Sequence, residues 1–252
     1  MTENIPNQAL LNDKCRKQSN FLHNDVFESI PKNYDLINRL FTLGMDVGWR
    51  NKAARESLKA KPQSVLDICC GTGDLALTVA KFAKYDLQVT GLDYSQPMLN
   101  VAIEKAQKDG YNVDFVNGDI ANIPFPDNSF DCLCIGFGFR NLTYKNGMAD
   151  RHIAEILRVL KPGGRFVIAE SSQPRPNARV IRYFHRRYLK HFIPFIGKLV
   201  SGNRIAYTYL GNSAANYYGA EELSDLLLKS GFSAVTFKRL FFGAAAIHVA
   251  VK

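Results

Sequence analysis

The chain has 252 residues and a net charge of +9, with 46% hydrophobic and 22% charged residues. These values are ordinary for a globular protein of one large domain. No apolar run reaches the roughly 18 residues that a membrane-spanning helix needs, and the polar N-terminus lacks the apolar core of a secretory signal peptide. We therefore expect neither, and the positive charge indicates an anionic partner, either a membrane surface or a nucleic acid.

The five cysteines form neither a C-x-x-C pair nor an even set. Cys69 and Cys70 are adjacent, while Cys132 and Cys134 share one apolar stretch. We expect reduced, buried thiols of an intracellular protein rather than disulfides. A catalytic cysteine is disfavoured because cysteines in strands usually just pack. The positions of His and Cys suggest no metal site.

Residues 1–25 are expected to form a flexible arm, and one domain spans 26–252. The first part of that domain, 26–60, has apolar and aromatic residues at helical spacing, which predicts a helical cap. The cap either only packs on the domain or also covers the substrate as a lid; the two interpretations are compatible. As a lid, it would turn three polar side chains toward the site: Tyr34, Asp35 and Asn38.

Strands and helices then alternate, which predicts a parallel sheet with helices on both faces. The expected strands are 64–69, 88–93, 112–117, 130–137 and 164–170. The expected helices are 73–84, 96–109 and 147–160, the last stopped by Gly163-Gly164. A helix at 220–230 and a hairpin of strands 235–240 and 244–251 complete the chain. The fold class is therefore α/β: a Rossmann-like, doubly wound, mostly parallel seven-stranded sheet with an antiparallel C-terminal hairpin, which binds ligands at its carboxyl edge.

The loop Cys70-Gly71-Thr72-Gly73-Asp74 joins the first expected strand to its helix. Glycines there let the backbone approach a ligand, and the helix N-terminus offers free N–H groups to an anionic part of it. A dinucleotide-binding loop would have a third glycine where this chain has Ala76. The loop therefore predicts a ligand other than NAD.

Three acids near this loop favour S-adenosylmethionine as that ligand. Asp74 would repel a pyrophosphate but suits a ligand with a positive centre, and Asp67 lies inside the strand that leads into the loop. Asp93 ends the second strand, where a carboxylate can accept both ribose hydroxyls. The alternative is a domain in which Gly71 and Gly73 only turn the chain.

Two further loops follow strands on the same expected edge. Asp119 after the third strand is placed to meet an adenine amino group, with the N–H of Ile120 near a ring nitrogen. The alternative there is a plain Gly-Asp turn. After the fourth strand, Gly136 would allow backbone contact near the methionine end, and Arg140 and Asn141 would face the methyl acceptor.

The stretch 175–204 is basic and amphipathic, and no Asp or Glu occurs from Ser171 to Ala220. Basic amphipathic helices bind membrane surfaces, and anionic lipid attracts each Lys or Arg by about 1 kcal/mol. One alternative is a solvated face over an ordinary core helix. A nucleic-acid groove is a weaker alternative because no RNA-binding signature accompanies the stretch.

The residues resemble the class I S-adenosylmethionine methyltransferases, and more narrowly the C-methyltransferases of menaquinone and ubiquinone biosynthesis. The selective segments are Tyr34–Trp49, Val65–Asp74, Gly136–Thr143, Arg158–Gly164, Glu170–Pro174 and Ile196–Leu199. The resemblance implies cofactor contacts at Thr72, Asp93, Asp119, Ile120 and Gly136. The chain departs from the family pattern at three cap positions, which usually hold Met, Ser and His: Ile37, Thr42 and Asp46.

The resemblance implies methyl transfer from S-adenosylmethionine to a ring carbon of a polyprenylated quinol, with no metal. The segment at 170–174 favours demethylmenaquinol over the benzoquinol of ubiquinone biosynthesis. Arg140 and Asn141 are candidates for contacts to the quinol oxyanion, and Tyr34 for a proton relay. An Arg acting directly as the base is disfavoured by its high pKa, so we expect water-mediated transfer.

A polyprenylated substrate resides in the bilayer, which would explain the basic, amphipathic stretch at 175–204. We therefore expect a cytoplasmic protein peripheral to the inner face of the membrane, with no nucleic-acid partner. A homodimer is compatible with the sequence, which leaves the oligomeric state open. Two rivals remain: methylation of RNA or another soluble acceptor, and a cofactor-binding partner protein without catalysis.

Overall fold

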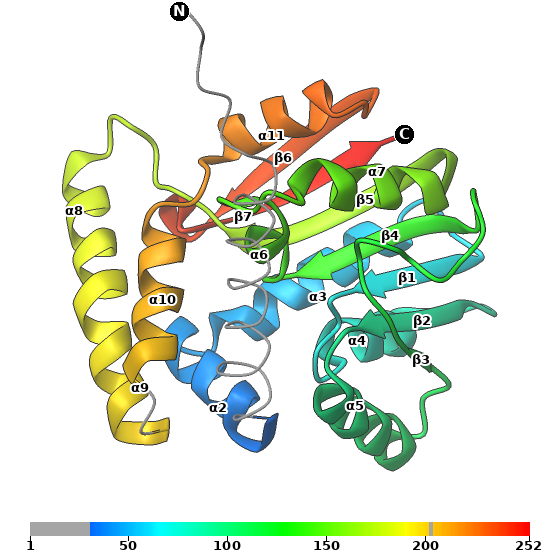
Figure 1. Ribbon diagram of the computed structural model, residues 1–252, viewed down its shortest axis with the longest axis horizontal. Helices are drawn as coiled ribbons and strands as arrows, with labels where there is room; N and C mark the ends of the chain where they lie inside the picture. The colour runs from blue at the N-terminus through cyan, green and yellow to red at the C-terminus, as the bar shows by residue number, and fades with distance from the viewer. Residues whose placement is uncertain (1–30, 202–203) are drawn as a thin grey trace, which may run out of the picture.

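The computed structural model describes residues 31–201 and 204–252 of the chain. They form a seven-stranded sheet in the order β3-β2-β1-β4-β5-β7-β6 with helices on both faces (Figure 1). The predicted α/β class, its strand number and its mixed character are confirmed. The arm predicted at 1–25 lies outside the described residues, and the domain boundary at residue 26 stays a prediction.

The parallel part of the sheet is β1 to β5, and its strands are set by short apolar runs. The strands are β1 (Ser64–Ile68), β2 (Gln88–Asp93), β3 (Asp114–Asn117), β4 (Phe130–Gly136) and β5 (Leu160–Ser171). β1 pairs in parallel with β2 on one side and with β4 on the other. The strand order therefore reverses at β1, and the loops after these strands meet at one edge, where open α/β sheets bind ligands.

The C-terminal hairpin is confirmed: β6 (Ala234–Leu240) and β7 (Ala245–Val251) are antiparallel, and β7 pairs antiparallel with β5. The predicted helix stop at Gly163-Gly164 is wrong, because both glycines lie within β5. The preceding helix ends at Val159, where the backbone N–H groups of Asn128 and Ser129 take up its last carbonyls. A neighbouring loop thus ends this helix.

Apolar residues alternate between the two faces of the sheet, as the period of a strand requires. One face packs against α3 (Met45–Leu58), α4 (Asp74–Phe82) and α5 (Gln96–Asp109). The other packs against α6 (Phe139–Thr143), α7 (Ala149–Val159) and α11 (Ala220–Lys229). In β1, Val65 belongs to the first core and Leu66 to the second, so one strand anchors both layers.

A helical lobe lies beside the sheet, at the left of Figure 1. It consists of α8 (Arg179–Arg187), the π-helical turn η2 (Tyr188–Phe192), α9 (Ile193–Ser201) and α10 (Arg204–Ala215). A third apolar cluster joins Phe41 of α2 (Pro31–Thr42) to Leu189, Ile193 and Tyr207 of the lobe. No helix within the described residues is long and apolar enough to cross a membrane.

Candidate active site

The loop after β1 is built from residues with left-handed backbone, including Gly71 (φ +55°) and Gly73 (φ +78°). A Cβ on Gly73 would lie 2.9 Å from the Cβ of Ala102, so this position tolerates no side chain, whereas Gly71 faces open space. The carboxylate of Asp93 holds the loop, accepting the N–H of Gly71 at 2.7 Å and that of Ser95 at 2.9 Å. The glycines therefore do more than turn the chain: Gly73 packs against a helix, and Gly71 opens onto a cavity.

Asp67 is the acid best placed to meet a cation. Its side chain is 1% exposed and lines a cavity between the β1 loop and the helical lobe. One oxygen accepts the N–H of Ala76 at 2.9 Å, and the other, Oδ1, has no hydrogen-bond partner within the described part of the chain. Burial raises the pKa of Asp67 to about 8. This buried, unpaired carboxyl oxygen fits the ammonium group of S-adenosylmethionine, which would supply the missing donor.

The predicted adenosine contacts follow the neighbouring strands. Asp93 ends β2, and the paired strand β3 leads to Asp119, an exposed residue whose carboxylate accepts the N–H of Ala121 at 2.9 Å. Ile120 beside it is buried. Because β2 and β3 are adjacent, these residues continue the edge that begins at Gly71, in the order that a ribose and an adenine require. Their role in binding stays a prediction.

The cavity that Asp67 lines has a volume of about 190 Å³ and extends from the β1 loop into the helical lobe. Of the predicted site residues, Asp67, Gly71, Thr72 and Gly136 line it; Gly73, Asp93, Asp119 and Ile120 do not. Its far wall is mostly apolar and comes from four segments distant in sequence: Phe41, Met45, Trp49, Tyr188, Leu189, Ile193, Leu210, Ala214, Phe241 and Ala244. The cavity is thus polar at one end and apolar at the other.

The predicted catalytic pair lies behind this cavity. Arg140 is 4% exposed, and its guanidinium binds the carboxylate of Glu170 at 3.1 Å and the hydroxyl of Ser171 at 2.8 Å. Ser171 lines the cavity, whereas Arg140 and Asn141 do not. The Oδ1 atom of Asn141 is buried without a partner within the described residues. Arg140 can therefore act on a substrate in the cavity through Ser171.

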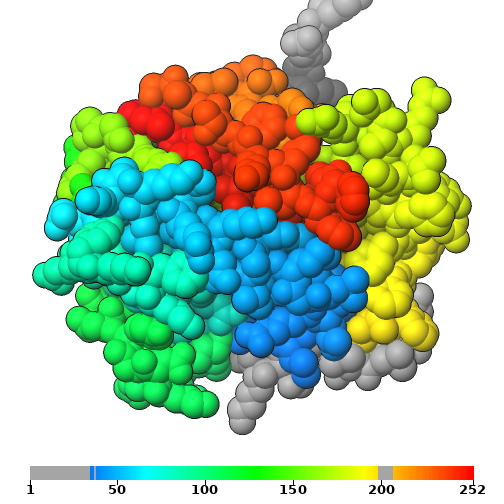
Figure 2. Space-filling model, turned by 180° about the vertical axis from the view of Figure 1, so that it is seen from behind, coloured from blue at the N-terminus to red at the C-terminus, as the bar shows by residue number. Residues whose placement is uncertain are grey.

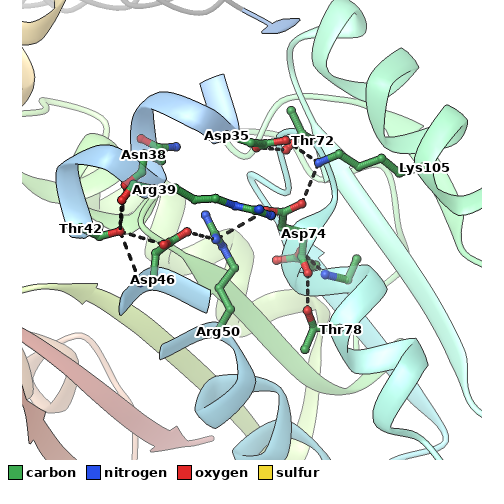
Figure 3. Close-up of polar contacts among 12 residues, drawn as sticks. Asp35, Asn38, Arg39, Thr42, Asp46, Arg50, Thr72, Asp74, Thr78 and Lys105 are labelled. Atoms are coloured by element: carbon green, nitrogen blue, oxygen red, sulfur yellow. Dashed lines mark hydrogen bonds and ion pairs between the residues drawn. The ribbon is translucent and has the colours of Figure 1, made fainter. Parts of the chain in front are cut away.

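The cap meets the loop after β1 through Asp35 of α2, which does not line the cavity. Its carboxylate accepts the hydroxyl of Thr72 at 2.7 Å and Nζ of Lys105 at 2.6 Å (Figure 3). Asn38 lines the cavity. The predicted proton relay Tyr34 lies in α2, and its side chain is outside the described part of the structure.

Sequence reasoning missed three polar groups around the cavity. Lys105 binds Asp74 at 2.7 Å, and Arg50 lies 3.5 Å from Asp74 on the cavity wall. Although burial alone would raise the pKa of Asp74, these two cations hold it below its usual value. The third is His185 of the lobe. Only the Asp46–Arg50 spacing of four residues on a helix could have signalled one of these contacts in advance.

His185 brings an imidazole to the apolar end of the cavity. Its Nδ1 atom is buried and has no hydrogen-bond partner among the described side chains and backbone groups. Burial lowers the pKa of His185, so the ring is neutral at pH 7. A neutral imidazole with a free nitrogen can accept a proton.

The cysteines are packing residues near the site. The described ones, Cys69, Cys70, Cys132 and Cys134, are free thiols, as predicted. Burial raises the pKa values of the Cys69 and Cys70 thiols well above normal, which disfavours a nucleophilic thiolate. Cys69 and Cys70 are half-buried rather than fully buried, because their loop borders the cavity. Residues 31–201 and 204–252 contain no group of three or more His, Cys, Asp or Glu side chains suited to a metal ion.

A model of the ubiE/COQ5 methyltransferase family matches residues 14–252. A Thermus thermophilus protein named demethylmenaquinone methyltransferase is 41% identical over 224 residues, which cover 89% of this chain and 98% of that protein. A Deinococcus radiodurans protein of the same name is 40% identical over 90% of this chain and 91% of its own length. A solved SAM-dependent methyltransferase from Aquifex aeolicus shares the fold, with a TM-score of 0.58 at 19% identity over 86% of this chain and 96% of that one. The chain therefore belongs to the ubiE/COQ5 methyltransferase family.

Proposed function

We propose that this chain transfers a methyl group from S-adenosylmethionine to a ring carbon of a polyprenylated demethylmenaquinol. One observation carries the proposal: a single cavity joins an acidic glycine loop to an apolar wall of aromatic and aliphatic side chains. The relatives named demethylmenaquinone methyltransferase match over almost their whole length, which supports this acceptor.

The reaction needs a deprotonated acceptor held in line with an electrophilic methyl group. Bound S-adenosylmethionine supplies that methyl group. The loop at Gly71 and Thr72 and the carboxyl of Asp67 would hold the cofactor at the polar end. At the other end the quinol hydroxyl would lose its proton, and the ring carbon would take the methyl group that the cofactor supplies, which leaves a neutral thioether. The ring proton would then pass to water, which restores aromaticity. Positioning the two reactants provides much of the rate enhancement.

The proton from the quinol hydroxyl passes to a group on the cavity wall. His185 lines the apolar end and has a free ring nitrogen. Arg140 is a poor base because its guanidinium stays protonated in the ion pair with Glu170, but it places a positive charge next to Ser171. In this proposal Arg140 and Asn141 stabilise the developing oxyanion, with Ser171 between them and the acceptor.

The helical lobe is the proposed membrane contact. Its outer face exposes aromatic side chains, including Phe184 at 64% and Phe195 at 60%. Arginines alternate with them: Arg179, Arg182, Arg186 and Arg187 of α8. In Figure 2 the turn after β6, which carries Phe241, lies between α2 and this lobe. A tail that enters from an anionic bilayer would reach the apolar wall of the cavity there, which favours a peripheral position at the inner membrane face.

The acceptor is tested by mass spectrometry of the quinone pool in cells that lack this protein. Accumulated demethylmenaquinone supports the proposal, while a normal pool contradicts it. Because the sequence also resembles the C-methyltransferases of ubiquinone biosynthesis, the benzoquinol precursor is the second candidate. Purified enzyme given each quinol in turn, with RNA as a third acceptor, separates the candidates.

Membrane contact is tested with the purified chain and vesicles. Co-sedimentation with phosphatidylglycerol vesicles, and its loss at high salt, is expected. Equal binding to neutral phosphatidylcholine vesicles would contradict an electrostatic contact. Full activity on a tail-less quinol without vesicle binding would favour a soluble acceptor.

A further inference from the structure

The polar end of the cavity presents a charge problem for its cofactor. S-adenosylmethionine has a sulfonium and an ammonium group, but also a carboxylate. The cavity wall carries Asp46, Asp67 and Asp74, which suit the two cations and repel the anion. Among the described residues that line the cavity, Arg50 is the one Lys or Arg side chain.

Arg50 is held firmly from α3. Its side chain is 10% exposed, and Nη1 contacts the carboxylate of Asp46 and that of Asp74, the latter at 3.5 Å (Figure 3). Asp46 is itself fixed, because it accepts the hydroxyl of Thr42 at 2.7 Å. A guanidinium has five N–H donors in a planar fork, and both ion pairs use the same nitrogen. Within the described residues, no ion pair or hydrogen bond uses Nε or Nη2, so these donors remain for a ligand.

The position of Arg50 along the cavity matches the methionine end of the cofactor. Its guanidinium carbon lies 5.8 Å from the ring centroid of Phe137, the residue that follows Gly136 at the end of β4. Trp49, the preceding residue, has its ring centroid 5.9 Å from that of Phe137. Arg50 therefore stands beside aromatic rings that exclude water, where a charged hydrogen bond is strong.

We propose that Arg50 binds the carboxylate of S-adenosylmethionine, and that Asp46 and Thr42 are positioning residues that orient it. Lys105 does not compete for this role. Lys105 is not part of the cavity lining. It approaches Asp74 from the side opposite Arg50 and forms ion pairs with Asp35 and Asp74 (Figure 3). Because the ammonium group of Lys105 compensates the charge of Asp74, the guanidinium of Arg50 is available to an anion.

The test compares two ligands that differ only in the carboxylate. Isothermal titration of the full chain measures the affinity for S-adenosylmethionine and for its decarboxylated form, which keeps the sulfonium and the amine. Arg50→Gln is expected to weaken S-adenosylmethionine about 10- to 100-fold, the range for one charged hydrogen-bonded contact. The same variant should bind the decarboxylated ligand with unchanged or higher affinity, because it lacks a positive charge near that cationic ligand. Arg50→Lys should fall between.

Arg55→Gln is the matched control on the same helix. Arg55 stacks on Phe82, with its guanidinium carbon 4.9 Å from the ring centroid, and lies outside the cavity lining, so both affinities should stay unchanged. Equal weakening of both ligands by Arg50→Gln would reduce Arg50 to a structural role and overturn the proposal. The wild-type chain gives a test that needs no variant: it must prefer the carboxylated ligand, and equal affinities would also overturn the proposal. Because no quinol is used, this result is independent of the acceptor.

Discussion

The two ends of the cavity are built by different means. The polar end, here named the cofactor end for its proposed ligand, comes from α3 and from the loops that directly follow β1 and β4, and hydrogen bonds and ion pairs of fixed geometry hold it. The apolar end, named the acceptor end for its proposed ligand, comes from α2, α3, α8, η2, α9, α10 and the turn after β6, and its contacts are mostly apolar. The cofactor end therefore discriminates by charge and backbone conformation, and the acceptor end by shape. Substitutions at the cofactor end should therefore cause large losses of binding, whereas substitutions at the acceptor end should cause smaller losses that scale with the apolar surface removed.

The largest effect is expected at Gly73, where the sheet fixes the loop. Gly73→Ala places a Cβ 2.9 Å from the Cβ of Ala102 in addition to the strain of positive φ. We expect loss of measurable cofactor binding in calorimetry. Gly110→Ala is the matched control, because Gly110 also has positive φ (+70°) but open space around it. It should cost only about 1 kcal/mol of unfolding free energy and leave binding intact. Normal binding by Gly73→Ala would contradict the rigid-loop account.

Next in size is the effect of removing the imidazole at the acceptor end. His185→Gln should lower kcat about 100-fold while cofactor affinity stays the same, because a general base contributes about that factor. The pH profile decides between catalysis and packing. Wild-type kcat should rise through the lowered pKa of His185, and the variant should lose this ascending limb. A kcat that falls with the limb retained would make His185 a packing residue.

Asp67 links the cofactor end to pH. Burial raises its pKa to about 8, so the ligand-free side chain is protonated at pH 6, and a bound cation favours the ionised form. Cofactor affinity should therefore rise with pH by up to about tenfold per unit below pH 8, and level off above it. Comparison with Asp67→Asn cancels the titration of the ligand amine. An identical pH dependence in the two proteins would show that Asp67 does not face the ammonium group.

The smallest effect is expected at the apolar wall. Phe241 lines the cavity yet is half-exposed, so Phe241→Ala should cost little stability. We expect KM for a prenylated quinol to rise about 3- to 10-fold, the value of part of one buried aromatic surface, with unchanged cofactor affinity. Phe237→Ala on β6, outside the cavity lining, is the control and should change neither. If Phe241→Ala lowered the affinity for the cofactor, the division of the cavity into a cofactor end and an acceptor end would be wrong.

The sequence predicted the strand, the loop and the helix of the cofactor end well because their determinants are local. Strand, glycine loop and helix follow one another from Ser64 to Phe82, and Asp93 comes at the end of the next strand, so spacing alone locates them. The family resemblance is confirmed by the match over residues 14–252. The start of β5 at Leu160 was missed because the loop at Asn128 and Ser129, not a glycine, ends α7.

The acceptor end could not be predicted in this way. Its wall joins Phe41, Leu189, Leu210 and Phe241, whose meeting depends on how the lobe docks against the sheet. The same holds for Arg140, predicted to face the acceptor but buried against Glu170, which lies 30 residues farther along the chain. Lys105 and Asp35 are 70 residues apart and meet only in the folded chain. Such pairings leave no periodic pattern in a single sequence.

The π-helical turn at Tyr188–Phe192 sets the rotational phase of everything that follows it in the lobe. A wide turn accommodates one more residue than an α-turn, and each residue turns a helix by about 100°. Deleting Lys190 would therefore rotate Ile193 about the helix axis and away from the cavity, while Arg182 and Arg186 would keep their orientation. The outer face of the lobe and the face that lines the cavity are therefore offset by an angle, and the number of residues in this turn sets that angle.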